Sequence, residues 1–168
     1  MEIERKYLIK RLPEDLDSFP SRKITQGYIC TDPVVRIRKD ADKAYLTCKG
    51  KGLISREEIN LPVSGSACDS LMKKAEGYII TKRRYIIPIK NPVFREGFTP
   101  PEGLSLKIEL DIFEEPFSPL ILAEVEFPDR ETADAYVMED WFSEDVSLDR
   151  RYHNSFMSEY GPEKVLSD

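Results

Sequence analysis

Residues 108–113 read I-E-L-D-I-F, and apolar and acidic side chains alternate from Ile108 to Ile112. Successive side chains of a β-strand point to opposite faces, so this segment predicts a strand with Glu109 and Asp111 on one face. Two other acidic pairs share the spacing: Glu2 with Glu4, and Glu124 with Glu126. The sequence therefore predicts strands that sort their charges by face.

Basic side chains follow the same rule in other predicted strands: Arg36 with Arg38, Lys82 with Arg84, and the single Lys49. Like charges on neighbouring positions repel, so a face exposed only to water gains nothing from this sorting. Carboxylate pairs suit a divalent cation, and basic pairs suit an oxyanion such as phosphate. Together they indicate a site for a metal ion and a phosphate.

A second interpretation stays open at this point. Charged residues make up 33% of the chain, and many antiparallel strands carry a polar outer face. A two-layer α+β sheet with its charged face toward solvent would produce the same alternation without a ligand.

Length and composition narrow the class of protein. The 168 residues are enough for one domain, 1–168, with a core that needs no disulfide or structural zinc. A net charge of −6 argues against DNA binding, and the absence of a long apolar run argues against a membrane span. Three widely spaced cysteines fit reduced thiols, so we expect a cytoplasmic protein.

About eight segments rich in β-branched and aromatic residues predict strands: 2–9, 24–30, 34–39, 43–50, 53–62, 79–89, 104–113 and 120–127. Helical spacing predicts a helix that begins at Ser64 or Ser66 and ends at Gly77. Two more helices are predicted over 129–139, capped by Asp129, and over 152–159. The proline-rich stretch 88–103 has no periodicity and predicts a loop.

So many antiparallel strands would leave two exposed edges unless the sheet closes. We therefore predict a mainly β fold, a closed eight-stranded antiparallel barrel with a charged central tunnel. The apolar faces of the strands would then point outward, and the helices would cover the barrel wall.

The opening E-I-E-R-K at 2–6 matches the E-x-E-x-K signature of the CYTH superfamily, the triphosphate tunnel metalloenzymes. The resemblance continues through Q-G-Y at 26–28, V-R-I-R at 35–38, T-C-K-G at 47–50, S-R-E-E at 55–58, T-K-R-R-Y at 81–85, I-E-L-D-I-F at 108–113, L-A-E-V-E-F at 122–127 and D-R-R-Y-H-N at 149–154. The chain is most similar in pattern to the compact bacterial inorganic triphosphatases of that superfamily.

This resemblance implies roles for individual residues. The phosphate ligands would be Lys6, Arg36, Arg38, Lys49, Arg56, Lys82, Arg84, Arg150 and Arg151. Glu2, Glu4, Glu124 and Glu126 would hold Mg²⁺ or Mn²⁺, and Glu58, Glu109 and Asp111 would line the tunnel wall. Tyr28 and Lys82 match the pair suggested to activate the attacking water in short bacterial members.

The chain departs from the pattern of those relatives in three places. Arg150 replaces the usual lysine ahead of Arg151, Asn60 replaces a frequent glutamate, and the 88–103 loop is long. The only histidine, His153, is expected at the surface without a role.

The resemblance and the charge pattern together predict hydrolysis of inorganic tripolyphosphate to diphosphate and phosphate. Thiamine triphosphatase, RNA 5′-triphosphatase and class IV type adenylate cyclase activities remain alternatives within the superfamily. A module that binds polyphosphate or a nucleotide without turnover is the alternative from another class. The sequence leaves a homodimer, the metal stoichiometry and the purpose of the 88–103 loop open.

Overall fold

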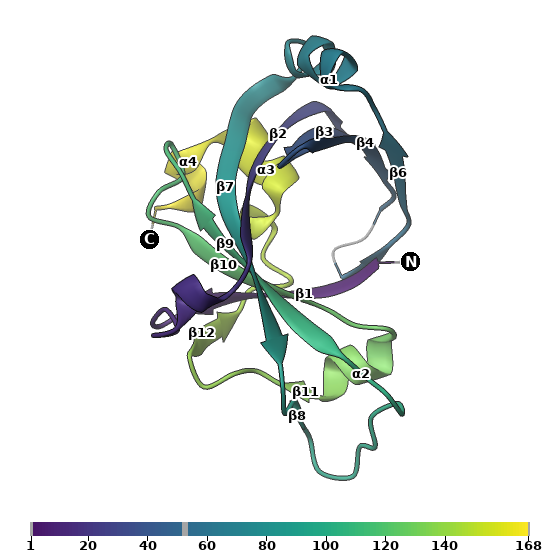
Figure 1. The fold of residues 1–168 in the computed structure, drawn as a ribbon, viewed down its shortest axis with the longest axis vertical. Coiled ribbons are helices and arrows are strands. Elements are labelled where there is room, and N and C mark those ends of the chain that lie inside the picture. Colours follow the sequence, from purple (N-terminus) through teal and green to yellow (C-terminus); the bar gives the residue numbers. More distant parts are fainter. Residues whose placement is uncertain (1, 52–53, 168) are drawn as a thin grey trace.

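The structure is a computed structural model that describes residues 2–51 and 54–167, without the side chains of 55 and 56. A ten-stranded antiparallel sheet dominates it (Figure 1). Its strands are β1 (Glu2–Ile9), β2 (Ser21–Thr31), β3 (Val34–Asp40), β4 (Lys43–Lys49), β5 (Ser55–Arg56), β6 (Glu58–Pro62), β7 (Glu76–Ile89), β9 (Leu106–Phe113), β10 (Ile121–Glu126) and β12 (Phe142–Asp145). The predicted mainly β fold is confirmed.

The strands follow the order β12-β1-β10-β9-β7-β2-β3-β4-β6 and curve around an interior (Figure 1). The predicted closed barrel is wrong, because the hydrogen-bonded order ends at β6 and no ladder joins β6 to β1. Between these two ends of the sheet, the described link is the two-residue β5, which pairs with β1 through Glu2 opposite Arg56 and Ile3 opposite Ser55. Glu57 separates β5 from β6, so the ring of strands is bridged at this point and not closed by a continuous ladder.

The helical elements are short: η1 (Leu16–Ser18), α1 (Gly65–Met72), α2 (Arg130–Ala135), η2 (Arg150–Tyr152), α3 (Asn154–Tyr160) and α4 (Pro162–Val165). Ser64 caps α1 by accepting the Ala67 N–H at 3.1 Å, and Asp129 caps α2 by accepting the Thr132 N–H at 2.7 Å. Both predicted helix starts are confirmed. None of the helices in the described ranges is long and apolar enough to cross a bilayer.

The predicted ends of two helices are wrong. The first ends at Met72, and Gly77 instead lies in β7 with a φ of +68°. The second ends at Ala135, because the next two residues form β11 (Tyr136–Val137). β11 pairs with β8 (Val93–Phe94), so the predicted 88–103 loop contains a strand. A two-residue strand pairing is too short to be seen in the sequence pattern.

A hydrophobic core lies on the outer face of the sheet, as the charge alternation predicts. Apolar side chains of β1, β9 and β10, such as Tyr7, Ile108 and Val125, pack there with Ala133 of α2 and with Phe142 of β12. The rings of Tyr7 and Phe142 stack with centroids 4.7 Å apart. Burial of these side chains holds α2 against the sheet.

Helix α3 departs from the expectation that every helix covers the outer wall. Its Met157 packs in a cluster with Tyr28, Ile80, Phe113 and Leu122, whose positions in their strands match those of the inner-face charges. The inner face is therefore apolar at one end and charged beyond it. Helix α3 covers the apolar end because those side chains would otherwise meet water.

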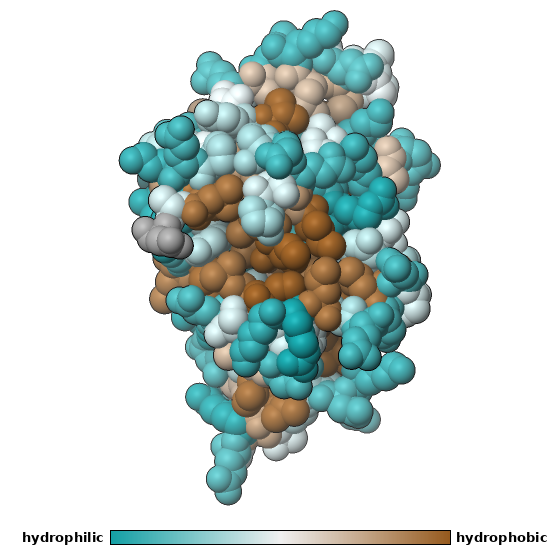
Figure 2. Space-filling model, turned by 90° about the vertical axis from the view of Figure 1, so that its left-hand side faces the viewer, coloured by the Kyte–Doolittle hydropathy of each residue, from teal (hydrophilic) through white to brown (hydrophobic). Residues whose placement is uncertain are grey.

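Some apolar side chains also reach the surface. Figure 2 shows hydrophobic side chains gathered across the middle of one side of the molecule, with hydrophilic side chains above and below. On β6, Ile59 is 69% exposed and Leu61 is 57% exposed. No helix in the described part of the chain covers these two side chains of β6, although the sequence predicted such cover.

The junction between β7 and α3 depends on Gly77. A Cβ at this position would lie 2.2 Å from the Ser158 carbonyl oxygen, and φ is +68°. We expect Gly77→Ala to lower the free energy of unfolding by about 2 kcal/mol or more, from left-handed strain and the clash together. Urea denaturation measures the change.

Gly97→Ala is the matched control. Gly97 has a φ of +82°, and apart from its two chain neighbours no described residue lies within 4 Å of the added Cβ, so it carries the strain without the clash. We expect it to cost only about 1 kcal/mol. Equal losses in the two variants would contradict the close approach of α3 to β7.

Candidate functional site

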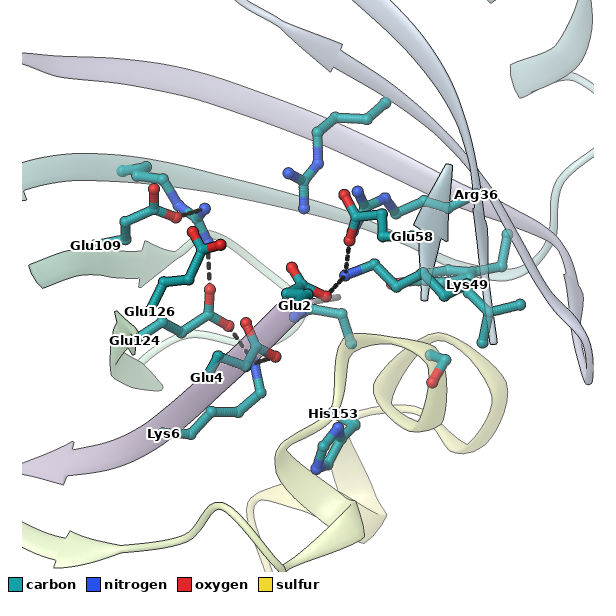
Figure 3. Close-up of a pocket in the computed structure, with 16 residues that line it drawn as sticks. Glu2, Glu4, Lys6, Arg36, Lys49, Glu58, Glu109, Glu124, Glu126 and His153 are labelled. Atoms are coloured by element: carbon teal, nitrogen blue, oxygen red, sulfur yellow. Dashed lines mark hydrogen bonds and ion pairs between the residues drawn. The ribbon is translucent and has the colours of Figure 1, made fainter. Parts of the chain in front are cut away.

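The antiparallel registers place the predicted charged rows side by side. Glu4 lies opposite Glu126 and Lys6 opposite Glu124 in the β1–β10 pair. The inner-face side chains enclose one pocket (Figure 3), called the charged pocket below. The predicted site residues in its lining are Glu2, Glu4, Lys6, Tyr28, Arg36, Arg38, Lys49, Glu58, Arg84, Glu109, Glu124 and Glu126.

Four predicted site residues are placed outside this lining, and a fifth has a side chain that the structure does not describe. Lys82 and Asp111 are fully buried behind the lining, where they bind each other. Arg150 and Arg151 of η2 are exposed and do not reach the charged pocket; Arg151 pairs instead with Asp149 at 2.7 Å. The side chain of Arg56 lies outside the described part of the chain.

One side of the charged pocket is internally compensated. Arg84 donates to Asp111 from Nε at 2.6 Å and from Nη2 at 2.7 Å, and to Glu124 from Nη2 at 2.7 Å. The Lys6 ammonium contacts Glu124 and also Glu4, the latter at 3.2 Å. Burial opposes ionisation of Glu124, but Lys6 and Arg84 hold its pKa well below the usual range. This network stabilises the ionised forms of Arg84, Asp111 and Glu124.

A second compensated group lies across the pocket (Figure 3). Lys49 is ion-paired with Glu2 at 2.8 Å and with Glu58 at 2.6 Å. Burial alone would raise the pKa of Glu58, but the Lys49 ammonium outweighs it and the pKa falls to about 2. Asn60 donates to Glu58 at 2.6 Å, so the side chain at the divergent position is part of this group.

Arg36 and Arg38 differ from the other basic side chains. Arg36 donates to the Thr47 hydroxyl at 3.3 Å and Arg38 to the Gln26 carbonyl at 2.9 Å, and neither has an ion pair with a described residue. Nε of Arg36 is buried and has no hydrogen-bond partner among the residues that the structure describes. Burial and the charge of Arg36 lower the pKa of Arg38 to about 10. This region has a positive charge that a bound anion would neutralise.

Glu126 is a carboxylate whose negative charge is not balanced by a described basic side chain. It forms no ion pair with any residue that the structure describes, and burial together with Glu109 raises its pKa. Burial and the nearby Glu4 likewise raise the pKa of Glu2. A cation beside these carboxylates would relieve their repulsion.

The donor set fits a divalent metal ion. Glu2, Glu4, Glu124 and Glu126 offer carboxylate oxygens, the ligands that Mg²⁺ and Mn²⁺ prefer. Within 2–51 and 54–167, no three His, Cys, Asp or Glu side chains already stand together as a metal centre. The fit rests on the chemistry of these carboxylate oxygens, which β1 and β10 bring to one pocket.

Sequence reasoning missed the contribution of the C-terminal segment. His153, Asn154 and Ser155 line the charged pocket, and the expectation of a surface His153 is wrong because its side chain is 5% exposed. Its Nε2 lies 3.2 Å from the Ser147 carbonyl oxygen. The signal was the D-R-R-Y-H-N motif at 149–154, but only the packing of α3 on the inner face brings its last residues to the pocket.

Tyr28 and Lys82 lie near the same pocket without a hydrogen bond between them in the described part of the chain. Lys82 contacts Asp111 and lies 3.3 Å from Oδ1 of Asn154, whereas the Tyr28 hydroxyl contacts Gln26. Burial lowers the pKa of Lys82 to about 8, although Asp111 opposes the shift.

Comparison with known proteins agrees with this geometry. Residues 1–140 match the family model of the CYTH domain. The chain belongs to the CYTH family. It is 34% identical over 161 residues to an inorganic triphosphatase from Nitrosomonas europaea, covering 94% of this chain and 96% of that protein.

A second relative, an inorganic triphosphatase from Acetivibrio thermocellus, is 34% identical over 163 residues, with 92% of this chain and 90% of that protein covered. The crystal structure of an inorganic triphosphatase superposes with a TM-score of 0.68 at 28% identity, covering 96% of this chain and 97% of the other. The family resemblance drawn from the sequence motifs is thus confirmed.

Two neighbouring carboxylates of β10 test the charge balance of the CYTH pocket. The depressed pKa of Glu124 means that its ionised form stabilises the fold above pH 4.5 and that this stability is lost as the pH falls through the folded-state pKa. We expect Glu124→Gln to lower the free energy of unfolding by roughly 3 kcal/mol at pH 7, because Lys6 and Arg84 lose a buried partner. The difference from the unaltered protein should shrink below pH 4.5.

Glu126→Gln is the matched control on the same strand. Its raised pKa means that the ionised form is disfavoured in the folded protein, so removal of the charge should not destabilise the fold at pH 7 in EDTA and should increase its stability. Urea denaturation from pH 3 to 8 compares the two variants. Similar losses of stability in both would contradict the assigned division of charges.

Proposed function

We propose that the protein is a metal-dependent inorganic triphosphatase that hydrolyses tripolyphosphate to diphosphate and phosphate. The observation that carries the proposal is the pair Arg36 and Arg38, two pocket guanidiniums whose only described partners are neutral. Such cations are costly unless an anion joins them. Relatives that match nearly the whole chain are inorganic triphosphatases, which supports the choice of anion.

In this proposal the basic side chains bind and align the phosphates. Arg36 and Arg38 present planar donor groups that match phosphate oxygens. Arg84, Lys6 and Lys49 are held by carboxylates and contribute positive potential from fixed positions. Phosphoryl transfer needs this alignment and charge neutralisation more than covalent catalysis.

The acidic side chains would hold the cation. Glu2, Glu4, Glu124 and Glu126 are the proposed ligands of Mg²⁺ or Mn²⁺, with Glu58 and Glu109 in the surrounding wall. A bound divalent ion would neutralise charge on the transferring phosphoryl group and orient the attacking water. Asp111 acts from behind the lining, where it fixes both Arg84 and Lys82.

Lys82 and Tyr28 remain the proposed catalytic pair. Burial lowers the pKa of Lys82 to about 8, which favours the neutral amine that a proton acceptor needs, and ligand binding would have to bring the attacking water within reach of this amine. Asn154, which contacts the Lys82 ammonium, would orient it.

The lining also favours an inorganic substrate. Apart from Tyr28 and His153, no described lining residue offers a ring on which a nucleobase or thiazolium could stack. The charged side chains instead surround the space from several strands (Figure 3). This pocket offers recognition for phosphate groups and little for an organic substituent.

Phosphate release from tripolyphosphate, ATP and thiamine triphosphate tests the proposal, with Mg²⁺, with Mn²⁺ and with EDTA. We expect rapid release from tripolyphosphate that requires the metal and much slower release from the two organic triphosphates. Faster phosphate release from thiamine triphosphate or ATP than from tripolyphosphate would contradict the proposed substrate and identify the preferred one. Binding of tripolyphosphate without release under any condition would favour a non-catalytic binding module.

Substitution of the uncompensated guanidinium tests its assigned role. We expect Arg38→Ala to raise KM for tripolyphosphate by about 10- to 100-fold, since a charge-assisted hydrogen bond is lost. Arg83→Ala is the control, because Arg83 alternates with Lys82 and Arg84 on β7 and is exposed. An unchanged KM in Arg38→Ala, or an equal rise in both variants, would contradict the role.

A further inference from the structure

Gln26 of β2 is buried in the protein interior, and its side chain is 0% exposed. It lies opposite Arg38 in the β2–β3 register and two residues before Tyr28. Its amide joins the two: Arg38 Nε donates to Oε1 at 2.9 Å, and Nε2 lies 3.3 Å from the Tyr28 hydroxyl oxygen. Arg38 and Tyr28 both line the charged pocket, whereas Gln26 stands behind them.

The chemistry of the three groups fixes the direction of both hydrogen bonds. A guanidinium has only donors, so the amide oxygen must face Arg38. The amide nitrogen must then face Tyr28, and it too can only donate. The Tyr28 oxygen therefore accepts this hydrogen bond, and the hydroxyl hydrogen is not used by Gln26.

No other described residue forms a hydrogen bond with the Tyr28 hydroxyl. Tyr28 lines the pocket directly opposite Arg36 in the β2–β3 register, beside the uncompensated guanidiniums. The unused hydrogen is therefore available to an anion bound by Arg36 and Arg38. A hydroxyl that donates to an ionised acceptor forms one of the stronger hydrogen bonds in proteins.

We propose that Gln26 is a positioning residue that orients Tyr28 as a hydrogen-bond donor to a phosphate oxygen of the bound triphosphate. The same amide holds Nε of Arg38 and leaves the two terminal nitrogens of that guanidinium for the ligand. This inference rests on the proposed function, and it assigns to Tyr28 a binding interaction that does not require contact with Lys82.

Gln26→Glu tests the direction of the hydrogen bond. A carboxylate at this position accepts from Arg38 as before, but it also accepts the Tyr28 O–H, so the hydroxyl turns away from the ligand. The substitution also adds a negative charge, which weakens anion binding by itself. Repeating it in a Tyr28→Phe background separates the two effects, because the charge acts in both backgrounds and the reversal acts only with Tyr28.

The measurement is calorimetric affinity for inorganic tripolyphosphate in EDTA, where binding is read without turnover. We expect Tyr28→Phe to weaken binding by about tenfold and Gln26→Glu to weaken it about tenfold more with Tyr28 present than in the Tyr28→Phe background. An equal loss in both backgrounds would overturn the inference, as would tripolyphosphate binding that is unaffected by Tyr28→Phe.

Gln26→Met provides a second, uncharged variant if the glutamate variant does not fold, with urea denaturation as the check. Without the amide, Tyr28 is not held in its donor orientation, so Tyr28→Phe should cost less affinity in the Gln26→Met background than in the unaltered protein. A role for Gln26 in packing alone predicts the same cost in both, and that result would overturn the inference.

The outcomes also separate this inference from the proposed function. If the unaltered protein binds tripolyphosphate but releases no phosphate with any metal, the proposed activity fails. The affinities of the Gln26 variants, measured with Tyr28 and with Tyr28→Phe, still test the role of Gln26. If the activity is present and substitution of Gln26 has the same effect on affinity with Tyr28 as with Tyr28→Phe, only the role of Gln26 fails. If the unaltered protein does not bind tripolyphosphate, the inference is overturned as well.

Discussion

Compensation of buried charge is the constraint on which the rest of this molecule depends. Alternation along β1, β7, β9 and β10 turns charged side chains toward the inner face, where an unpaired charge would cost several kcal/mol. Arg84 meets this constraint by binding Asp111 and Glu124 from two different strands, and Lys6 binds Glu124 in turn. These contacts need neighbouring strands in register, so the curved sheet and its ion pairs stabilise each other.

The same constraint divides the pocket into a part whose charges neutralise one another and a part whose charges do not. Arg84 and Lys49 are neutralised by their own carboxylates, whereas Arg36 and Arg38 have only neutral partners among the described residues, and Glu126 lies among other carboxylates. An anion alone would satisfy the guanidiniums but increase the repulsion on Glu126. A cation alone would do the reverse. The two imbalances are relieved together only by a ligand that brings both charges, such as a metal-bound phosphate.

The parts of this structure that depend on local alternation were predictable, and the parts that depend on packing between distant segments were not. The face of Glu124 and the caps at Ser64 and Asp129 follow from two-residue spacing and side-chain chemistry. The burial of His153 depends on α3 crossing the inner face, which no periodicity within the helix specifies. The failure of the sheet to close depends likewise on the short register between β5 and β1, since strand patterns give faces but not the pairing of edges.

Neutral side chains beside the guanidiniums are as important to the site as the charges. A carboxylate next to Arg36 would hold it as Asp111 holds Arg84, and an incoming phosphate would then have to displace that carboxylate. The chain instead places the Thr47 hydroxyl there, and Thr47 donates at 2.6 Å to Asn60, which donates to Glu58. Every donor in this series points away from Arg36. Relatives often carry glutamate at the position of Asn60. With asparagine there, the first carboxylate in this series is that of Glu58, so the positive charge of Arg36 is left for the ligand to neutralise.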